Sequence, residues 1–403
     1  MTIAIAVAAA NTSTGNQDFT TTDMGGATPK GVIFLYSRSP ADGTITADSG
    51  ASFGAADGTN QWACANYIKD DLSDTLNDVG VSDKCLFALL NATTTHSEAA
   101  FVSFIANGVR VNWTTATTDG WLVTAILFSG AAVSFAAGKV NAQDGTAVNV
   151  GFEPDIVLFA GSGRSLGRDT SLGSRGRIGF GGNAWPGGNR KGAFGSRWSW
   201  TPTRQRVSWL SGGVSQTAMA LFDPFLGVSV IADRTATGFA VDSFLGATSA
   251  EWGYVAFKAN SGTCGCLQLT AATGDQTVTG LGFEPELILL FGGETVTNDA
   301  AEFTGSNAFA AATALKTGGF ATCSQNGGGV DKSTAFEDKV RILAPGGTEN
   351  CRFTVSDIFD GGFTLNFTDA PNGAWQMPYI AFGPTGGGGG GSVPARVQAW
   401  ITD

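Results

Sequence analysis

The chain has 403 residues, of which 43% are hydrophobic and 14% are charged, and this balance excludes an intrinsically disordered protein. Its 58 glycines favour short strands joined by turns over helices. The net charge of −11 argues against binding to nucleic acid or to an anionic membrane, because each phosphate contact needs a Lys or Arg. The single histidine, His96, excludes any site built from two imidazoles, and the six cysteines lack paired zinc-binding spacing.

The first ten residues are predicted to form a strand, because Ile3, Ile5 and Val7 alternate along the chain. No basic stretch precedes this short apolar run, so we expect no signal peptide. No later segment reaches the roughly 20 uninterrupted apolar residues of a spanning helix. We therefore expect a chain made in the cytoplasm without membrane insertion.

An internal repeat organises the sequence. Gly-Phe-Glu-Pro-Asp-Ile-Val-Leu-Phe occupies 151–159, and Gly-Phe-Glu-Pro-Glu-Leu-Ile-Leu-Leu occupies 282–290. A diverged copy at 26–34 keeps the proline but has Thr28 in place of glutamate and Gly31 in place of the apolar residue. The prolines at the shared position are Pro29, Pro154 and Pro285. Self-similarity on this scale predicts tandem structural units.

Two further landmarks recur in the same order in each copy. Apolar strands that end in Phe close the copies at 125–128, 254–257 and 379–382. Strands that begin with Gly precede these at 108–111, 238–241 and 362–365. The three landmarks predict three domains at 1–135, 136–261 and 262–384, each near the size of one β-sandwich.

We predict an all-β fold of three tandem jelly-roll-like sandwiches. The run after each shared proline is continuously apolar and is expected to be buried on both faces. Residues 109–113 and 363–367 alternate instead, which predicts one solvated face. Asp-Gly pairs such as Asp57-Gly58 supply turns. One alternative stays open, because residues 81–107 contain no Gly or Pro and are compatible with a helix that starts near Ser97.

The segment 164–206 departs from the repeat and is expected to be an insertion in the second domain. It holds nine basic residues and one acidic residue, and tryptophans accompany them. Arginine with tryptophan is enriched at interface hot spots, so we predict a docking face for an acidic partner or a second copy. A solvated glycine-rich loop with core tryptophans is the alternative. The candidate contacts are Arg164, Arg168, Arg175, Arg177, Trp185, Arg190, Lys191, Arg197, Trp198, Trp200, Arg204 and Arg206.

The C-terminal residues 385–403 form the second departure. Gly386 to Gly391 is an unbroken glycine run that is typical of a flexible linker. Val397, Trp400 and Ile401 lie in the short apolar segment beyond it. We predict a tethered arm that adds to the sheet edge of a partner, and a frayed terminus is the alternative.

Groups for catalysis are sparse in this sequence. His96 lies among threonines and serine, which is typical of an exposed turn rather than of a general base. No nucleotide, calcium or zinc motif is complete, so we expect no cofactor and no metal. Paired carboxylates for glycoside hydrolysis cannot be identified without their separation. The expectation is a protein that is not an enzyme.

The repeat carries a resemblance to a known class. The Gly-Phe-x-Pro-Asp run at 151–159, the Gly-Phe-x-Val strand at 238–241 and the Tyr-x-Ala-Phe strand at 254–257 resemble tandem domains of virion structural proteins of tailed bacteriophages. Capsid-decoration and tail-fibre-like proteins belong to this class. The resemblance implies a structural protein on the virion exterior that binds capsid or tail subunits and associates with itself. Three similar domains in one chain also imitate a trimer and would suit a threefold axis of a shell.

Two other functions are carried as alternatives. The first is a receptor-binding protein that holds a host-surface glycan on aromatic platforms. Its candidate residues are Trp113 and Trp121, together with Trp252 and Trp375. Core filling is the simpler explanation for these rings, because they recur at similar places in the repeat. The second alternative is a polysaccharide depolymerase.

Overall fold

The fold is built from β-strands, as the sequence predicts. The computed structural model describes residues 1–68, 77–91, 94–116, 118–131, 133–141, 146–161, 167–169, 176–185, 190–198, 204–210, 219–221, 228–243, 251–259, 261–294, 301–302, 306–325 and 330–383. Within these ranges the only helical element is the short turn η1 (Thr22–Met24). The prediction of an all-β chain is therefore confirmed.

The described strands repeat with a period of eleven, which defines three units. Unit 1 contains β1(Thr2–Ala9), β2(Gly15–Thr20), β3(Gly31–Ser37), β4(Thr46–Ala47), β5(Ser49–Ala56), β6(Gln61–Ile68), β7(Asn77–Ser82), β8(Leu86–Asn91), β9(Thr94–Ile105), β10(Gly108–Thr115) and β11(Leu122–Ser129). Unit 2 contains β12(Phe135–Asn141), β13(Thr146–Asn149), β14(Ile156–Gly161), β15(Gly167–Asp169), β16(Gly176–Ala184), β17(Arg190–Trp198), β18(Arg204–Leu210), β19(Met219–Leu221), β20(Val228–Thr235), β21(Gly238–Ser243) and β22(Glu251–Phe257). Unit 3 contains β23(Ser261–Gln268), β24(Gly274–Thr279), β25(Leu287–Gly292), β26(Ala301–Glu302), β27(Ser306–Ala312), β28(Thr317–Gln325), β29(Val330–Glu337), β30(Val340–Leu343), β31(Glu349–Phe359), β32(Gly362–Asp369) and β33(Gln376–Gly383).

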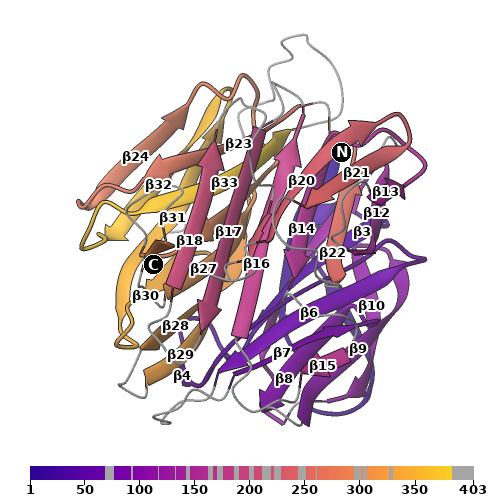
Figure 1. The fold of residues 1–403 in the computed structure, drawn as a ribbon, viewed down its shortest axis with the longest axis horizontal. Coiled ribbons are helices and arrows are strands. Elements are labelled where there is room, and N and C mark those ends of the chain that lie inside the picture. Colours follow the sequence, from indigo (N-terminus) through magenta and orange to yellow (C-terminus); the bar gives the residue numbers. More distant parts are fainter. Residues whose placement is uncertain are drawn as a thin grey trace.

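Each unit supplies six strands of one seven-stranded sheet, called here its long sheet, and all strands of one four-stranded sheet, called its small sheet. In unit 1 the long sheet runs β1-β11-β3-β5-β6-β7, and the small sheet runs β2-β10-β9-β8. Figure 1 shows the three units as purple, pink and orange-yellow groups of strands. They differ from the expected jelly roll in one respect. The consecutive strands β5, β6 and β7 stay together as a meander, whereas a jelly roll alternates between its sheets.

The seventh strand of each long sheet comes from another unit. β15 of unit 2 pairs with β7 of unit 1, and β26 of unit 3 pairs with β18 of unit 2. β4 of unit 1 pairs with β29 of unit 3 and so completes the cycle. Because every unit gives one strand and receives one, the three units form a closed ring rather than a linear string.

The apolar run after each shared proline explains why the units meet. In β14, Val157 and Phe159 belong to the cluster between the sheets of unit 2, whereas Ile156 and Leu158 belong to a central cluster. Every residue of β14 is buried, which confirms the prediction of burial on both faces. One face of the long sheet therefore packs on its own small sheet, and the other face packs on the other two units.

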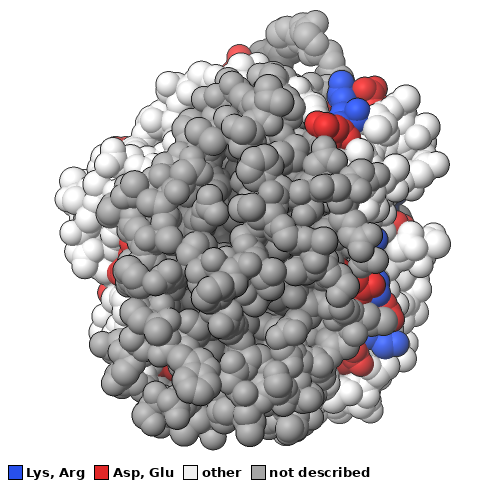
Figure 2. All heavy atoms as spheres, viewed as in Figure 1, with Lys and Arg blue, Asp and Glu red and all other residues white. Residues whose placement is uncertain are grey.

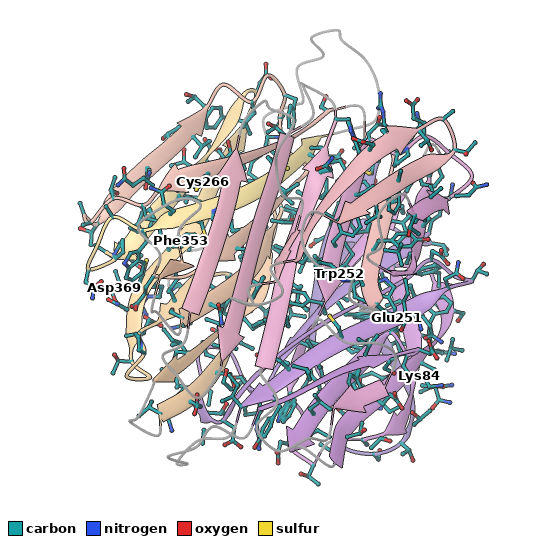
Figure 3. All side chains as sticks on the ribbon, in the orientation of Figure 1. Lys84, Glu251, Trp252, Cys266, Phe353 and Asp369 are labelled. Carbon is teal, nitrogen blue, oxygen red and sulfur yellow. The ribbon has the colours of Figure 1, made fainter. Side chains whose placement is uncertain are left out.

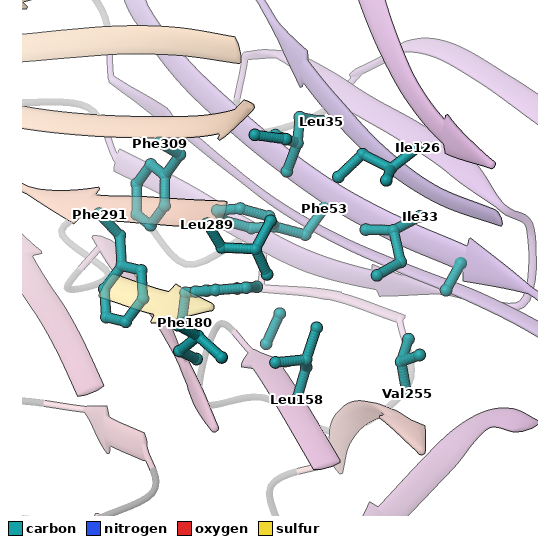
Figure 4. Packing of buried hydrophobic residues seen from close by; sticks show 14 of the residues in the cluster. Ile33, Leu35, Phe53, Ile126, Leu158, Phe180, Val255, Leu289, Phe291 and Phe309 are labelled. Carbon is teal, nitrogen blue, oxygen red and sulfur yellow. The ribbon is translucent and has the colours of Figure 1, made fainter. Parts of the chain in front are cut away.

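The central cluster contains residues from all three units (Figure 4). It includes equivalent residues of the closing strands, Ile126, Val255 and Ile380. Aromatic rings from different units also contact one another in it. Phe53 lies 5.3 Å from Phe180 and 4.7 Å from Phe309, measured between ring centroids. Phe257 lies 5.5 Å from Phe128 and 4.9 Å from Phe382.

Two expectations need correction. The helix considered for residues 81–107 is wrong, because this stretch contains the end of β7 together with β8 and β9. The segment 164–206 is not an insertion, because β15 to β18 occupy the sheet positions that β4 to β7 occupy in unit 1. The repeat is difficult to recognise in this segment, because arginine and glycine interrupt the apolar pattern of its strands.

Candidate functional site

The boundaries between units are the best-defined contact sites. Gly31, Ile156 and Leu287 occupy one position in the three units, and each lies opposite the closing Phe of its own unit. At the boundary of units 1 and 2, Gly31 faces the Phe135 ring, which a side chain at Gly31 would overlap. At the boundary of units 2 and 3, Ile156 faces Gly262, where an added Cβ would lie 2.8 Å from Ile156 Cδ1.

This pairing of a small with a large residue is reversed between these two boundaries. Phe135 and Gly262 are themselves equivalent, because they lie beside Phe257 and Phe382 in their sheets. The departure of Gly31 from the repeat pattern is therefore explained by the ring of Phe135. A core that is packed to crystal-like density requires such complementary volumes.

In units 1 and 2, the residue after the shared proline binds the chain that enters the next unit. Lys30 Nζ donates to the carbonyl oxygen of Ala131 at 3.1 Å. Asp155 Oδ2 accepts from the backbone N–H of Ala259 at 3.1 Å. Glu286 occupies the equivalent position in unit 3. The three residues differ in charge but occupy equivalent positions in the three units.

Burial perturbs the two acids among them. Desolvation raises the pKa of Asp155, and the lowering effects of Lys258, the Ala259 N–H and Arg234 only partly oppose it. Desolvation also raises the pKa of Glu286 to about 7. The neighbouring carboxylate of Glu284 acts in the same direction, whereas the amino group of Met1 opposes it. Glu286 is therefore partly protonated near neutral pH.

Most of the described basic residues of 164–206 lie on neighbouring strands of the long sheet of unit 2, whereas Arg168 lies at the edge of the long sheet of unit 1. Arg168 lies on β15, Arg177 on β16, and Arg204 and Arg206 on β18. β17 carries Arg190, Lys191, Arg197 and Trp198. Arg177, Arg197 and Arg204 stand opposite one another in the register of β16, β17 and β18. The topology thus brings together positions that the sequence separates by up to 27 residues.

Some of the other predicted contact residues lie outside the part of the chain that the structure describes. Arg164, Arg175, Trp200 and the whole C-terminal arm, with Val397, Trp400 and Ile401, lie outside the described residues. Trp185 is half-buried and packs on the core of unit 2. In Figure 2, the Lys and Arg side chains that are described on the visible face lie along its right edge among Asp and Glu, and further acidic side chains lie at the top and on the left.

The tryptophans proposed for glycan binding are buried. Trp113 is 1% exposed and Trp121 is 3% exposed, and both belong to the core of unit 1. Trp252, labelled in Figure 3, and Trp375 are equally buried in units 2 and 3. This placement corrects the glycan-platform alternative, because a sugar needs an exposed aromatic face. The Trp113 indole N–H instead donates to Gln17 Oε1 at 2.7 Å.

His96 is buried rather than exposed, which corrects the prediction of a turn. It lies at a bulge of β9, and its ring stacks on Trp121 at 3.6 Å between centroids. A bulge in β31 places Asn350 at the equivalent position of unit 3. Desolvation, reinforced by the charge of Arg38, lowers the pKa of His96 to about 4 despite the opposing effect of Asp119.

The surroundings of His96 contain the residue types of a hydrolytic triad but not its geometry. Ser97 Oγ lies 3.3 Å from Nδ1, and Asp119 Oδ2 lies 3.9 Å from Nε2. Ser97 is fully buried and is also hydrogen-bonded to Tyr36 Oη at 2.8 Å. A nucleophile must reach its substrate, and a base with a pKa near 4 accepts a proton poorly at neutral pH.

Five of the six cysteines are buried. All six are free, and Cys266 is the only partly exposed one. Burial raises the pKa of Cys64, Cys266 and Cys323 to about 12, so these thiols are unreactive. No group of three His, Cys, Asp or Glu side chains in the described ranges is placed to hold a metal ion.

Sequence reasoning missed the boundary residues Phe135 and Gly262 and the shared role of the residue after proline. The signal was present, since an alignment of the three copies places Lys30, Asp155 and Glu286 in one column.

No protein-family model matches the chain, and no curated protein matches its sequence. No helix within the described part of the chain is long and apolar enough to cross a membrane.

Proposed function

We propose that this chain is a non-enzymatic structural protein on the exterior of a bacteriophage particle, where it decorates the shell as the one-chain counterpart of a trimer. The observation that carries the proposal is the closed exchange of β4, β15 and β26 around a shared core. A protein built in this way offers three related surfaces about one axis. It therefore suits a site where three neighbouring subunits meet.

The phage setting rests on the resemblance of the repeat at 151–159, 238–241 and 254–257 to virion structural domains. The charge distribution supports docking to neighbours. Segment 164–206 carries a net charge of +8, whereas the whole chain carries −11. Because β16, β17 and β18 are neighbours in the long sheet of unit 2, most of this positive charge is concentrated in that sheet. We assign this sheet to contact with an acidic shell subunit.

The proposal is tested by locating the protein on particles by cryo-electron microscopy. We expect one copy at each local threefold position on the outer surface. Its absence from purified particles would contradict the virion assignment. Its presence at another position, such as an extended fibre, would contradict only the threefold assignment.

The docking sheet has a separate test. Replacing Arg177, Arg197 and Arg204 together with glutamate should lower the affinity for particles by at least about tenfold, with the loss reduced at high salt. Exchanging the same number of basic residues in unit 3, Lys316, Lys339 and Arg352, is the matched control. Equal binding by both variants and the wild type would remove the role of this sheet.

A further inference from the structure

The ring is closed by residues 38–48 of unit 1, called here the closing loop, which lie between β3 and β5 and are all described. Within this loop, β4 pairs with β29 of unit 3. The Gly43 N–H donates to the carbonyl oxygen of Ala335 at 2.9 Å, and Asp42 Oδ1 accepts from the N–H of Glu337 at 3.0 Å. The closing loop therefore holds the first unit against the last one.

Arg38 and Asp48 join the two ends of the closing loop. Arg38 Nη1 lies 2.7 Å from Asp48 Oδ2, and both side chains are largely buried. The same carboxylate oxygen of Asp48 accepts from Tyr67 Oη at 3.1 Å. Ser333 Oγ of unit 3 lies 3.1 Å from the carbonyl oxygens of both Arg38 and Asp48. The ion pair thus lies where unit 3 binds the loop.

Trp121 connects the closing loop to His96. The Arg38 guanidinium lies 5.3 Å from the centroid of the Trp121 ring, which is a cation–π distance. The His96 ring stacks on the same indole, with centroids 3.6 Å apart. The backbone links the two regions as well, because the N–H of Leu122 donates to the carbonyl oxygen of Ser39 at 2.7 Å. A displacement of Trp121 therefore acts directly on the closing loop.

A proton on His96 is disfavoured by this packing. The side chain is buried, so a positive charge there loses most of its hydration. Among the described residues, Arg38 repels this charge, whereas the half-exposed Asp119 attracts it from 3.9 Å. The nearby Tyr36 stays neutral because burial raises its pKa. The pKa of His96 is about 4 in the closed arrangement, so an open loop with the ordinary value of 6.5 binds the proton about 300-fold more tightly.

The equivalent site of unit 3 is built differently. Glu294 occupies the position of Arg38, and Asn350 occupies that of His96. The Asn350 side-chain amide donates to Glu294 Oε1. A neutral side chain thus faces an acid in unit 3, whereas a titratable base faces a cation in unit 1. Of these two units, it is the one whose loop closes the ring that carries the titratable base.

We propose that His96 is a pH switch for the closing loop. When the imidazole gains a proton, it leaves the Trp121 ring, Arg38 moves away from it, and β4 separates from β29. The contact of the closing loop with unit 3 then opens, while the central cluster stays packed. At neutral pH the proton is released and the loop closes again. The proposal does not depend on the virion function.

Hydrogen exchange of the full chain, measured by mass spectrometry at pH 7 and pH 4.5, tests the proposal. Protection factors correct for the intrinsic effect of pH on exchange. Those of residues 41–48 report on the closing loop, and those of 156–161 report on β14, which packs on the central cluster. We expect the protection of 41–48 to fall at least about tenfold at pH 4.5, and that of 156–161 to change less than about threefold.

Two variants assign the response to His96. His96→Asn gives unit 1 the neutral side chain of unit 3 and should remove the acid-dependent fall in the protection of 41–48. Asn350→His is the matched control, because a histidine there faces Glu294 rather than a cation. In this control, residues 41–48 should respond to acid as in the wild type. Wild-type protection of 156–161 at pH 7 shows that each variant folds.

Three results would overturn the proposal. If the fall persists in His96→Asn, the acid response belongs to another group, such as the Asp48 carboxylate. If residues 41–48 keep their protection in the wild type at pH 4.5, the switch does not operate. If 41–48 and 156–161 lose protection equally, acid unfolds the whole chain instead of opening the loop. The last two comparisons need only the wild type, so they stand even where a variant fails to fold.

Discussion

Exchanging the two sides of one boundary is a direct test of how the ring is packed. Gly31 and Phe135 form a small and large pair between units 1 and 2, and Ile156 and Gly262 form the reversed pair between units 2 and 3. The double variant Gly31→Ile with Phe135→Gly transfers the second arrangement to the first boundary. Both glycines lie outside the left-handed region, so their backbones accept the exchange.

The single variants should both destabilise the protein. Gly31→Ile drives a side chain into the Phe135 ring, and such overpacking costs about 1–3 kcal/mol. Phe135→Gly removes a ring that packs on Phe128 at 5.1 Å between centroids, for a loss of about 3 kcal/mol. If the volumes compensate, the double variant should lose about 2 kcal/mol less than the sum of the two.

Equilibrium denaturation of the four proteins measures this coupling. Gly346→Ala is a control, because an added Cβ there would meet no atom within 4 Å, and it should change stability by less than about 0.5 kcal/mol. Additive losses, within about 0.5 kcal/mol, would refute the claim that Gly31 and Phe135 are paired across the boundary.

Two predictions concern pH. The pKa of His96 is about 4 in the folded protein, against an ordinary value of 6.5, so its contribution to stability is complete above pH 6.5 and is lost as the pH falls towards 4. His96→Asn gives unit 1 the residue that unit 3 has at the equivalent position, Asn350. In this variant the free energy of unfolding, measured by urea titration at pH 7 and pH 4.5, should no longer show this acid-dependent loss of about 2 kcal/mol. If the free energy of unfolding differs between the two pH values by as much in the variant as in the wild type, the assignment of the loss to His96 is contradicted. Glu286 has a raised pKa of about 7 against 4.5, so its contribution is complete below pH 4.5 and is lost as the pH rises through 7. Glu286→Gln should therefore raise the melting temperature at pH 8 but not at pH 4, unlike the exposed control Glu284→Gln.

The repeat was predictable because its landmarks have a physical cause. Residues 151–159 and 282–290 are continuously apolar since both faces of their strands are covered, one by the small sheet and one by the other units. The alternation at 109–113 likewise follows from β10, in which Val109 and Val111 are buried and Asn112 is exposed. These patterns are local, so a single copy of the sequence carries them.

The ring was not predictable, because it depends on contacts between distant residues. β4, β15 and β26 contain only two or three residues each, and their partners lie in other units. Strands this short contain too few residues to show the alternation of apolar and polar residues that identifies a strand in a sequence. The position of His96 was missed for a related reason, since a bulge in β9 turns the chain locally and breaks the alternation.

The most direct test of the closed ring is a disulfide between its first and last units. Thr46 in β4 and Ser333 in β29 stand opposite each other, and directly opposed antiparallel residues have Cα atoms about 4.5–5.5 Å apart, which a disulfide can bridge. Replacing both with cysteine should give, on mild oxidation, a disulfide within one chain that shifts mobility on a non-reducing gel. Absence of the bond, or bonds formed only between chains, would contradict the closed ring.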